Sequence, residues 1–584
     1  MIKKRISLSI CLAALILCAI SCKQDAPKIG TSEPNGIQLP EKPNILWLVT
    51  EDMGHYIPPF GDSTIVTPNL NRLAAEGIRY PNFFSPSGVC APSRAAITTG
   101  MYPSGIGANH MRTNQFMRIT GLPAYEAVPP PETKMVSELL REQGYYCTNN
   151  VKGDYQFNAP VTAWDDYSWY GHWRNRPEGQ PFFAVINFTQ THESCLFEPY
   201  AFRKEEQRHY ASGDTTYIVS RERSETDVKI HVPKDMDFKI PPYLPDTDIV
   251  QRDMWKLYNN IIEMDRQVGA VLKQLEEDGL LENTIIFFYG DHGGPLPRQK
   301  RLIYDSGLRT PLMVRFPNKQ KAGTQDDQLL SFVDLAPTLL SLTGQEPKDY
   351  MDGRAFLGAF ANEEERKYIH AAADRFDEVT DAIRAVRDER FKYIRNYRPE
   401  QPYYLPLGYR ERIPTMQELL RLNDKGELNE AQALWFRKTK DKEELYDCLN
   451  DPHELHNLAD DPKYKGKLDE LRSEMDRWLT EIGDTPNLPE RELITALWDG
   501  KEQKPMTQNP TVRQTADSLF VDCGTKGASI GYKLIKKGHA TPKSWSVYNE
   551  PLPVTKSDSI VVQAHRIGYE PSETLTLSLE NTKI

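Results

Sequence analysis

The sequence has few of the features typical of nucleic-acid-binding, disulfide-stabilised or repeat proteins. Its 584 residues carry a net charge of -11 and contain no block rich in lysine and arginine, which argues against nucleic acid as a partner. There is no internal repeat. Half of the eight cysteines lie outside any motif, and their spacing is not that of a disulfide scaffold: Cys147, Cys195, Cys448 and Cys523. The composition is ordinary for a folded protein and allows a large core with at least one smaller domain.

The apolar run near the N-terminus is too short for a membrane span. It covers Ile6 to Ile20 and follows basic residues, a combination typical of a signal peptide. It ends in Ala19-Ile20-Ser21-Cys22, which resembles a bacterial lipoprotein cleavage box with Cys22 as the acylated residue. We expect residues 1–21 to be a signal peptide and residues 22–41 a tether. The protein would then be exported and lipid-anchored, in the bacterial periplasm or at the outer-membrane surface, with the lipid as its only membrane contact.

Three apolar runs have the pattern of parallel strands buried on both faces. They cover residues 44–50, 182–188 and 284–289. Acidic or histidine residues follow each run: Glu51 and Asp52, His192 and Glu193, and Asp291 and His292. Because sites gather at the carboxyl ends of parallel strands, we expect these clusters to meet. Helical stretches lie between the runs, and this alternation predicts an α/β fold with a mixed, mostly parallel sheet sandwiched by helices.

The pattern changes twice in the second half of the chain. From about residue 365 shorter strands and charged helices follow one another, and Val512 to Leu579 is strand-like. We therefore predict a catalytic α/β domain over residues 42–364 and a smaller α+β subdomain over residues 365–500. A small all-β module would follow over residues 501–584.

A cysteine motif follows the first apolar run. Residues 90–100 read Cys-Ala-Pro-Ser-Arg-Ala-Ala-Ile-Thr-Thr-Gly, which matches the signature Cys-x-Pro-Ser-Arg-x-x-x-x-Thr-Gly of type I sulfatases. Over roughly residues 42 to 490 the chain resembles these formylglycine-dependent sulfatases of the alkaline phosphatase-like superfamily. Pro92 suits the first turn of a helix and would place residue 90 just before its positive end. The alternative is a buried free cysteine beside a turn.

The resemblance implies sulfate ester hydrolysis and a modified residue. In this family a sulfatase-maturating enzyme oxidises the cysteine to formylglycine, whose hydrated aldehyde attacks sulfur. A thiol, mostly protonated at neutral pH, would serve this role poorly. The resemblance also implies a divalent cation, Ca²⁺ before Mg²⁺, with these ligands: Glu51, Asp52, Cys90, Asp291 and His292. The family has aspartate at the position of Glu51.

Further catalytic roles are implied by the same resemblance. Arg94 matches the arginine that steadies the diol, Lys300 the lysine that contacts the sulfate, and His192 the acid that protonates the leaving group. Lys152 matches the lysine of a Gly-Lys-x-His element. Asp154 stands where that element has its histidine. A carboxylate can act as a base but repels a sulfate, so the role of Asp154 stays open.

Residues for substrate binding are less specific in the sequence. We assign His110, His172 and Arg309 to this role. The aromatic residues between Trp164 and Trp173 have two interpretations, because they can pack in a core or stack on sugar faces.

The substrate we expect is an extracellular sulfated glycan. The Glu-Asp form of the first metal pair and the phrase Thr191-His-Glu are similar to sulfatases near heparan N-sulfatase, but they do not separate N-sulfate from O-sulfate. Two alternatives stay open. One is a phosphodiesterase or phosphonate hydrolase of the same superfamily, and the other is an inactive lipoprotein that binds sulfated glycans.

Overall fold

The computed structural model describes residues 36–150, 152–209, 215–225, 228–515, 518–554 and 558–579. The predicted signal peptide, Cys22 and most of the predicted tether lie outside these ranges. Within them, no helix combines the length and the apolar character needed to cross a membrane.

A nine-stranded sheet forms the centre of the first part of the chain. Its strands are β1 (Asn44–Thr50), β2 (Ile78–Phe84), β3 (Tyr146–Asn150), β4 (Asp166–Tyr167), β5 (Phe182–Phe188), β8 (Thr284–Gly290), β9 (Arg309–Arg315), β10 (Thr324–Gln325) and β11 (Leu330–Ser331). Their order is β10-β2-β9-β8-β1-β5-β3-β4, and β11 pairs with β2. β1 runs parallel to β5 and β8, whereas β9 runs antiparallel to β8 and β2. The prediction of a mixed, mostly parallel sheet is confirmed.

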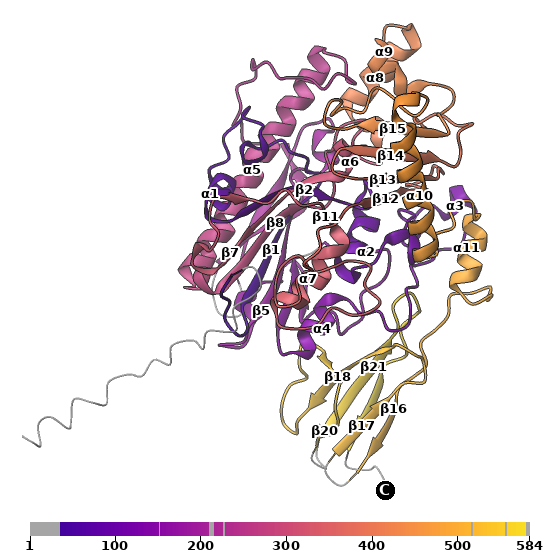
Figure 1. Cartoon of the computed structure of the whole chain (residues 1–584). Helices are drawn as coiled ribbons and strands as arrows, with labels where there is room; N and C mark the ends of the chain where they lie inside the picture. The colour runs from indigo at the N-terminus through magenta and orange to yellow at the C-terminus, as the bar shows by residue number, and fades with distance from the viewer. Residues whose placement is uncertain are drawn as a thin grey trace, which may run out of the picture.

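Helices cover both faces of this sheet (Figure 1). One face packs on α1 (Pro68–Glu76) and α5 (Asp248–Glu277), and the other on α2 (Cys90–Thr99), α4 (Val136–Glu142) and α7 (Leu335–Leu342). In β1, Leu46 and Leu48 belong to the apolar core on the α5 side, whereas Ile45, Trp47 and Val49 belong to the core on the α7 side. Because successive side chains of a strand point to opposite faces, a strand covered on both sides must be apolar throughout.

A second, antiparallel sheet follows the first. It consists of β12 (Ile369–Ala373), β13 (Ile383–Arg387), β14 (Phe391–Asn396) and β15 (Glu443–Asp447). Further helices in and around this part are α3 (Met117–Thr120), α6 (Asp305–Leu308), α8 (Pro414–Lys425), α9 (Glu430–Ala433), α10 (Lys465–Ile482) and α11 (Glu490–Leu497). Trp478 and Met475 of α10 pack against Tyr393 and Val386 of the sheet, which gives this part an apolar core of its own. A separate antiparallel pair joins β6 (Phe202–His209) to β7 (Thr215–Ser224).

The C-terminal part is built from two small antiparallel sheets and lies at one end of the molecule (Figure 1). One contains β16 (Thr511–Gln514), β17 (Ser518–Asp522) and β20 (Leu552–Pro553). The other contains β18 (Ser529–Ile535), β19 (Ser546–Val547), β21 (Ser559–His565) and β22 (Leu575–Ser578). Their facing apolar residues form a separate core around Leu519 and Val562. The expected all-β segment is therefore present, while the exact domain boundaries stay predictions.

Candidate active site

Three buried strands end side by side and deliver the residues of the site. Thr50, the last residue of β1, is in register with Phe188 of β5 and with Gly290 of β8. The chain segments that follow these strands therefore start at the same edge of the sheet. α2 begins there as well, at Cys90. The polar clusters meet, as the strand pattern predicted.

Four buried residues form the centre of the site. Asp52, Cys90, Asp291 and His292 each offer one ligand atom, and these atoms lie within 4.8 Å of one another. The Cys90 Sγ atom lies 3.4 Å from Nε2 of His292 and 3.9 Å from Oδ1 of Asp52. Asp52 has a φ of 50°, a left-handed conformation that few residues other than glycine adopt. Backbone strain of this kind gathers at functional sites, where the surroundings hold it in place.

Cations surround this group of four residues. The Lys300 Nζ atom lies 2.7 Å from Oδ2 of Asp52 and 3.7 Å from Sγ of Cys90. Arg94 donates from Nε to Asp291 at 3.1 Å and from Nη1 to Asn187 at 2.8 Å. Its Nη2 atom is buried and has no hydrogen-bond partner among the described residues. An unsatisfied buried guanidinium nitrogen is costly, so this atom is suited to bind an anion beside residue 90.

Opposite charges keep the carboxylates of the site ionised. Burial alone would raise the pKa of Asp52, but the positive charges of Lys300, His192 and His292 hold it well below its usual range. Burial would lower the pKa of His292, yet the carboxylates of Asp291 and Asp52 raise it to about 10. The protein alone thus balances the acidic groups with an imidazolium and an ammonium. A bound cation would compete with both.

Glu51 faces a different partner from the one predicted. Its Oε1 atom lies 2.8 Å from Nζ of Lys152, and its Oε2 atom lies 3.9 Å from Nε2 of His192. Glu51 is absent from the group of four possible ligands in the described structure, so the arrangement does not reproduce its predicted ligand role. Lys152 also lies 3.7 Å from Asp154. The longer glutamate side chain therefore links the first strand end to Lys152 and His192.

His192 lies in a short turn directly after β5. Its Nδ1 atom accepts a hydrogen bond from the backbone N–H of Ser194 at 3.2 Å, and the Ser194 hydroxyl lies 2.8 Å from the same atom. Because Nδ1 accepts, the proton of the neutral ring is on Nε2. Nε2 is the atom that faces Glu51. The ring is thus held in the form needed to donate a proton toward the site.

Two residues that sequence analysis left without a role help to build the site. The backbone N–H of Glu193 donates to Oδ2 of Asp52 at 2.7 Å, and the Glu193 carboxylate lies 3.2 Å from Nζ of Lys300. Arg301 binds the same carboxylate with both terminal nitrogens, at 2.8 Å and 2.9 Å, and donates from Nε to Asp377 at 3.0 Å. The sequence offered one signal for these two residues, because each directly follows a predicted site residue, His192 or Lys300.

The structure places His172 far from this site, so the geometry around Cys90 does not support its predicted substrate contact. Its ring lies against Trp173, which stacks on Phe182 at the first residue of β5. The site follows the last residue of the same strand, and seven residues of strand span about 20 Å. Trp164 and Trp173 are both buried and pack in the core, whereas Tyr167 and Tyr170 are exposed, so the core interpretation holds only for the two tryptophans.

His110 and Arg309 are also occupied elsewhere. The buried Nδ1 atom of His110 accepts from the backbone N–H of Arg375 at 3.1 Å, and burial lowers the pKa of this ring. Arg309 lies at the correct edge of the sheet, but its guanidinium donates to Pro81 O at 2.8 Å and to Asn82 at 2.9 Å. These contacts do not support the predicted substrate-binding roles.

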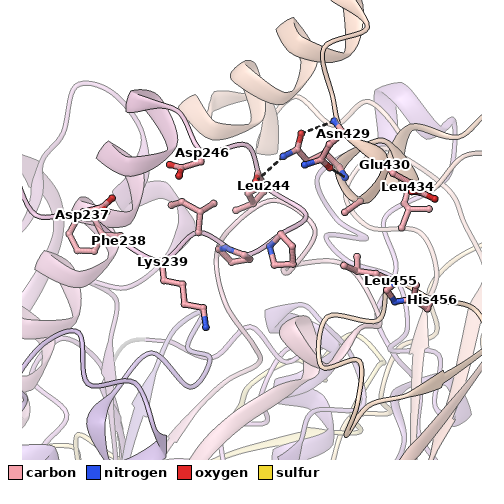
Figure 2. A pocket seen from close by; sticks show the side chains of 15 residues that line it. Asp237, Phe238, Lys239, Leu244, Asp246, Asn429, Glu430, Leu434, Leu455 and His456 are labelled. Atoms are coloured by element: carbon pink, nitrogen blue, oxygen red, sulfur yellow. Dashed lines mark hydrogen bonds between the residues drawn. The ribbon is translucent and has the colours of Figure 1, made fainter.

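A large hollow lies apart from the predicted residues. It has a volume of about 930 Å³ and is lined by residues 237–242 and 429–432 together with Leu244, Asp246, Leu434, Leu455 and His456 (Figure 2). Its wall is held by Gln432, which donates to Leu244 O at 3.2 Å. This lining has prolines and aliphatic side chains but no member of the reaction centre around Cys90.

Comparison with known proteins identifies the family. Residues 43–176 and 167–345 match the family model described as Sulfatase. An ulvan-active sulfatase of Formosa agariphila is 63% identical over 573 residues, which cover 96% of each chain. The chain belongs to the sulfatase family. It is a sulfuric ester hydrolase, as the cysteine motif predicted.

More distant relatives agree with this assignment. Residues 291–410 of the sulfatase match a model described as N-sulphoglucosamine sulphohydrolase, C-terminal. Human N-sulphoglucosamine sulphohydrolase is 26% identical over 469 residues, which cover 76% of this chain and 90% of the human one. A solved 2-O GAG sulfatase has the same fold, with a TM-score of 0.52 and 18% identity over 76% of this chain and 93% of its own. The alkaline phosphatase-like fold and the similarity to N-sulfatases are thus confirmed.

Proposed function

We propose that this sulfatase removes sulfate groups from ulvan, using a formylglycine made from Cys90. The choice of ulvan as substrate is supported by the 63% identity, over nearly the whole of both chains, to the ulvan-active sulfatase of Formosa agariphila. The chemistry is supported by the position of Cys90, which is buried at the start of α2 and surrounded by Lys300, Arg94 and His292. A sulfate group beside residue 90 would meet positive charge on several sides.

A sulfatase-maturating enzyme is the partner we propose for residue 90. Formylglycine supplies a hydrated aldehyde, so that an oxygen nucleophile takes the place of the thiol. The unpaired Nη2 of Arg94 supports this replacement, because a buried donor would gain an acceptor there. Arg94 is itself fixed by Asp291 and Asn187, so it can orient that group without rearranging.

Ca²⁺ is the cation we propose for the site. Asp52, Asp291, His292 and residue 90 would hold it, since their ligand atoms already lie within 4.8 Å of one another. Two carboxylates and a diol oxygen suit a hard cation, whereas the imidazole nitrogen departs from an all-oxygen set. The ion supplies positive charge against the sulfate. Metal analysis of the purified protein by mass spectrometry tests the choice of Ca²⁺ over Mg²⁺.

The remaining side chains are proposed to handle charge and protons. Lys300 and Lys152 bind the sulfate, and His192 protonates the leaving oxygen through Nε2. Burial would raise the pKa of Asp154, yet Lys152 and other cations lower it, so this group is ionised and able to accept a proton. We propose Asp154 as the base in place of the histidine that the family pattern leads one to expect.

The position of the enzyme in the cell is also a proposal. After export, a lipid on Cys22 would keep the catalytic part at the membrane surface, where it can meet an extracellular polymer. Labelling with a radioactive or clickable fatty acid tests this, because Cys22→Ser should abolish the label.

One experiment tests the substrate. The matured enzyme is incubated with ulvan, with other sulfated glycans and with N-sulfated and O-sulfated monosaccharides, and released sulfate is measured. We expect release from ulvan at the highest rate. Hydrolysis of an aryl phosphate diester with no sulfate release would instead favour the phosphodiesterase alternative, and no release from any compound would favour the inactive binding protein.

A further inference from the structure

A second, smaller pocket adjoins the reaction centre. It has a volume of about 230 Å³ and is lined by three polar or aromatic segments: 112–115, 125–126 and 154–159, together with Tyr167. Pockets for drug-sized ligands measure about 300–1,000 Å³, so this one has room for a single small unit such as one sugar ring. Asp154, one of its lining residues, lies beside Lys152 of the reaction centre.

A chain of hydrogen bonds connects the wall of this pocket to the residue that orients position 90. The Tyr155 hydroxyl accepts from Asn149 at 2.7 Å, and Asn149 accepts from Asn187 at 2.9 Å. Asn187 in turn accepts from Arg94 at 2.8 Å. The three bonds are buried and join α2, the neighbouring strands β5 and β3, and the segment after β3. These bonds thus fix the position of the pocket wall relative to the reaction centre.

Arg112 is the cation of this pocket, and its charge is only partly used. Its Nε atom lies 3.5 Å from Oδ1 of Asp377, and 31% of its side chain is exposed. In the described structure its terminal nitrogens have no hydrogen bond. Asp377 does not depend on this contact, because Arg301 donates to it at 3.0 Å. The guanidinium of Arg112 can therefore bind a ligand without leaving a buried carboxylate unpaired.

Arg112 is the positively charged group among lining residues that also include the carboxylates of Glu126 and Asp154. Burial would lower its pKa, but the negative charges of Asp154 and Asp377 raise it, so the guanidinium lies close to the carboxylate beside Lys152. Tyr155 and Phe157 stack with ring centroids 5.9 Å apart and give the pocket a rigid aromatic side. A planar guanidinium binds carboxylate and sulfate groups with two parallel hydrogen bonds.

We propose that this pocket binds the sugar next to the sulfated one, and that Arg112 recognises a carboxylate or a second sulfate on it. Arg112 is then a specificity-determining residue for a substrate with two negative charges. The assignment rests on the proposed glycan sulfatase activity and deepens it. A sulfated monosaccharide or an aryl sulfate would leave the pocket empty.

The test uses disaccharides that share the sulfated unit and differ in its neighbour. One neighbour is a uronate, one is the same sugar reduced to the neutral alcohol, and one carries a second sulfate. We expect the wild type to show kcat/KM about 10- to 100-fold higher for whichever anionic neighbour it recognises than for the neutral one, the range expected for a charge-assisted hydrogen bond. Arg112→Met should remove this preference, and its rate on nitrophenyl sulfate, which cannot reach the pocket, should fall by a smaller factor than its kcat/KM on the recognised anionic disaccharide.

Two further variants complete the test. Arg118→Met removes an exposed arginine of α3 and should keep the preference. Arg112→Lys keeps the positive charge but loses the planar guanidinium, so it should keep only part of the preference for the anionic neighbour. A wild type without any preference, or a preference that survives in Arg112→Met, would overturn the proposal. A wild type inactive on all disaccharides and on nitrophenyl sulfate would refute the glycan sulfatase activity and the subsite with it.

Discussion

The role of His192 as the leaving-group acid leads to a prediction that depends on the substrate. The ring is oriented by Ser194, whose backbone N–H and hydroxyl hold Nδ1 at 3.2 Å and 2.8 Å. Nε2 is left to donate the proton. A sugar hydroxyl is a poor leaving group and needs this proton, whereas nitrophenolate leaves without it. His192→Ala should therefore slow the two substrates by very different factors.

The size of the effect follows from the step that is lost. General acid catalysis contributes about 10²- to 10⁴-fold, which is about 3–5 kcal/mol of transition-state stabilisation. We expect kcat on a sulfated sugar to fall by that factor in His192→Ala, while kcat on nitrophenyl sulfate falls less than about 10-fold. Ser194→Ala keeps the imidazole but loosens the hydroxyl contact to Nδ1, so it should cause a smaller loss with the same substrate dependence.

The assay compares steady-state kinetics on both substrates, with sulfate release and nitrophenolate absorbance as readouts. Because His192 also lies 3.9 Å from Glu51, its loss could disturb the site more generally. A general disturbance would slow both substrates alike. Equal losses on the sugar and aryl sulfates in His192→Ala would therefore refute the assignment of His192 as the acid.

The other parts of the account lead to three more predictions. Asp154→Asn should slow sugar and aryl sulfates by the same factor, because a base acts after the leaving group has departed; unchanged rates for both would make Asp154 a bystander. Prolonged chelation should abolish sulfate release and Ca²⁺ should restore it, whereas full activity of a metal-free preparation would contradict the proposed ligands Asp52, Asp291 and His292. Burial would raise the pKa of Glu76, but hydrogen bonds from Arg315 and Arg72 lower it to about 2. A carboxyl group with a lowered pKa stabilises the fold at pH values above the pKa of about 4.5 that it has in the unfolded chain. This stabilisation is lost as the pH falls toward 2. Glu76→Gln should therefore have a lower Tm than the wild type at pH 7 and the same Tm near pH 2. A Tm difference that does not change with pH would contradict this role of the Glu76 carboxylate.

Much of the fold was predictable because its strongest signal is local. The apolar runs that became β1, β5 and β8 are uninterrupted, and a strand covered on both faces requires this. The polar residues after them, Asp52 and Asp291 among them, were predictable as a cluster, since parallel strands end at one edge. The cysteine motif then supplied the position of residue 90. Each inference needed only the spacing of residues along the chain.

Contacts between distant segments were less predictable. His172 adjoins the strand that leads to His192, but it precedes the strand, and the start of a strand lies at the opposite edge of the sheet from its end. His110 follows the Cys90 helix closely, yet its ring turns toward Arg375 of the second sheet region. The pairing of Arg301 with Glu193 joins residues 108 positions apart, and no local pattern indicates it.

The partner of Glu51 shows the same limit at the centre of the site. Aspartate and glutamate carry the same charge, so a family pattern assigns either one to the metal. The extra methylene lets the carboxylate reach Lys152 at 2.8 Å. Side-chain reach decides this contact, and it becomes visible only when both strand ends are in place.

The central claim is that residue 90 reacts as formylglycine, and peptide mass spectrometry coupled to activity tests it most directly. Protein is produced with increasing amounts of a sulfatase-maturating enzyme, and the fraction of residue 90 that is about 18 Da lighter than cysteine is measured in each preparation. We predict that sulfate release from ulvan rises in proportion to this fraction and is absent in folded Cys90→Ala. Equal activity in preparations with unmodified Cys90, or activity in Cys90→Ala, would contradict the claim.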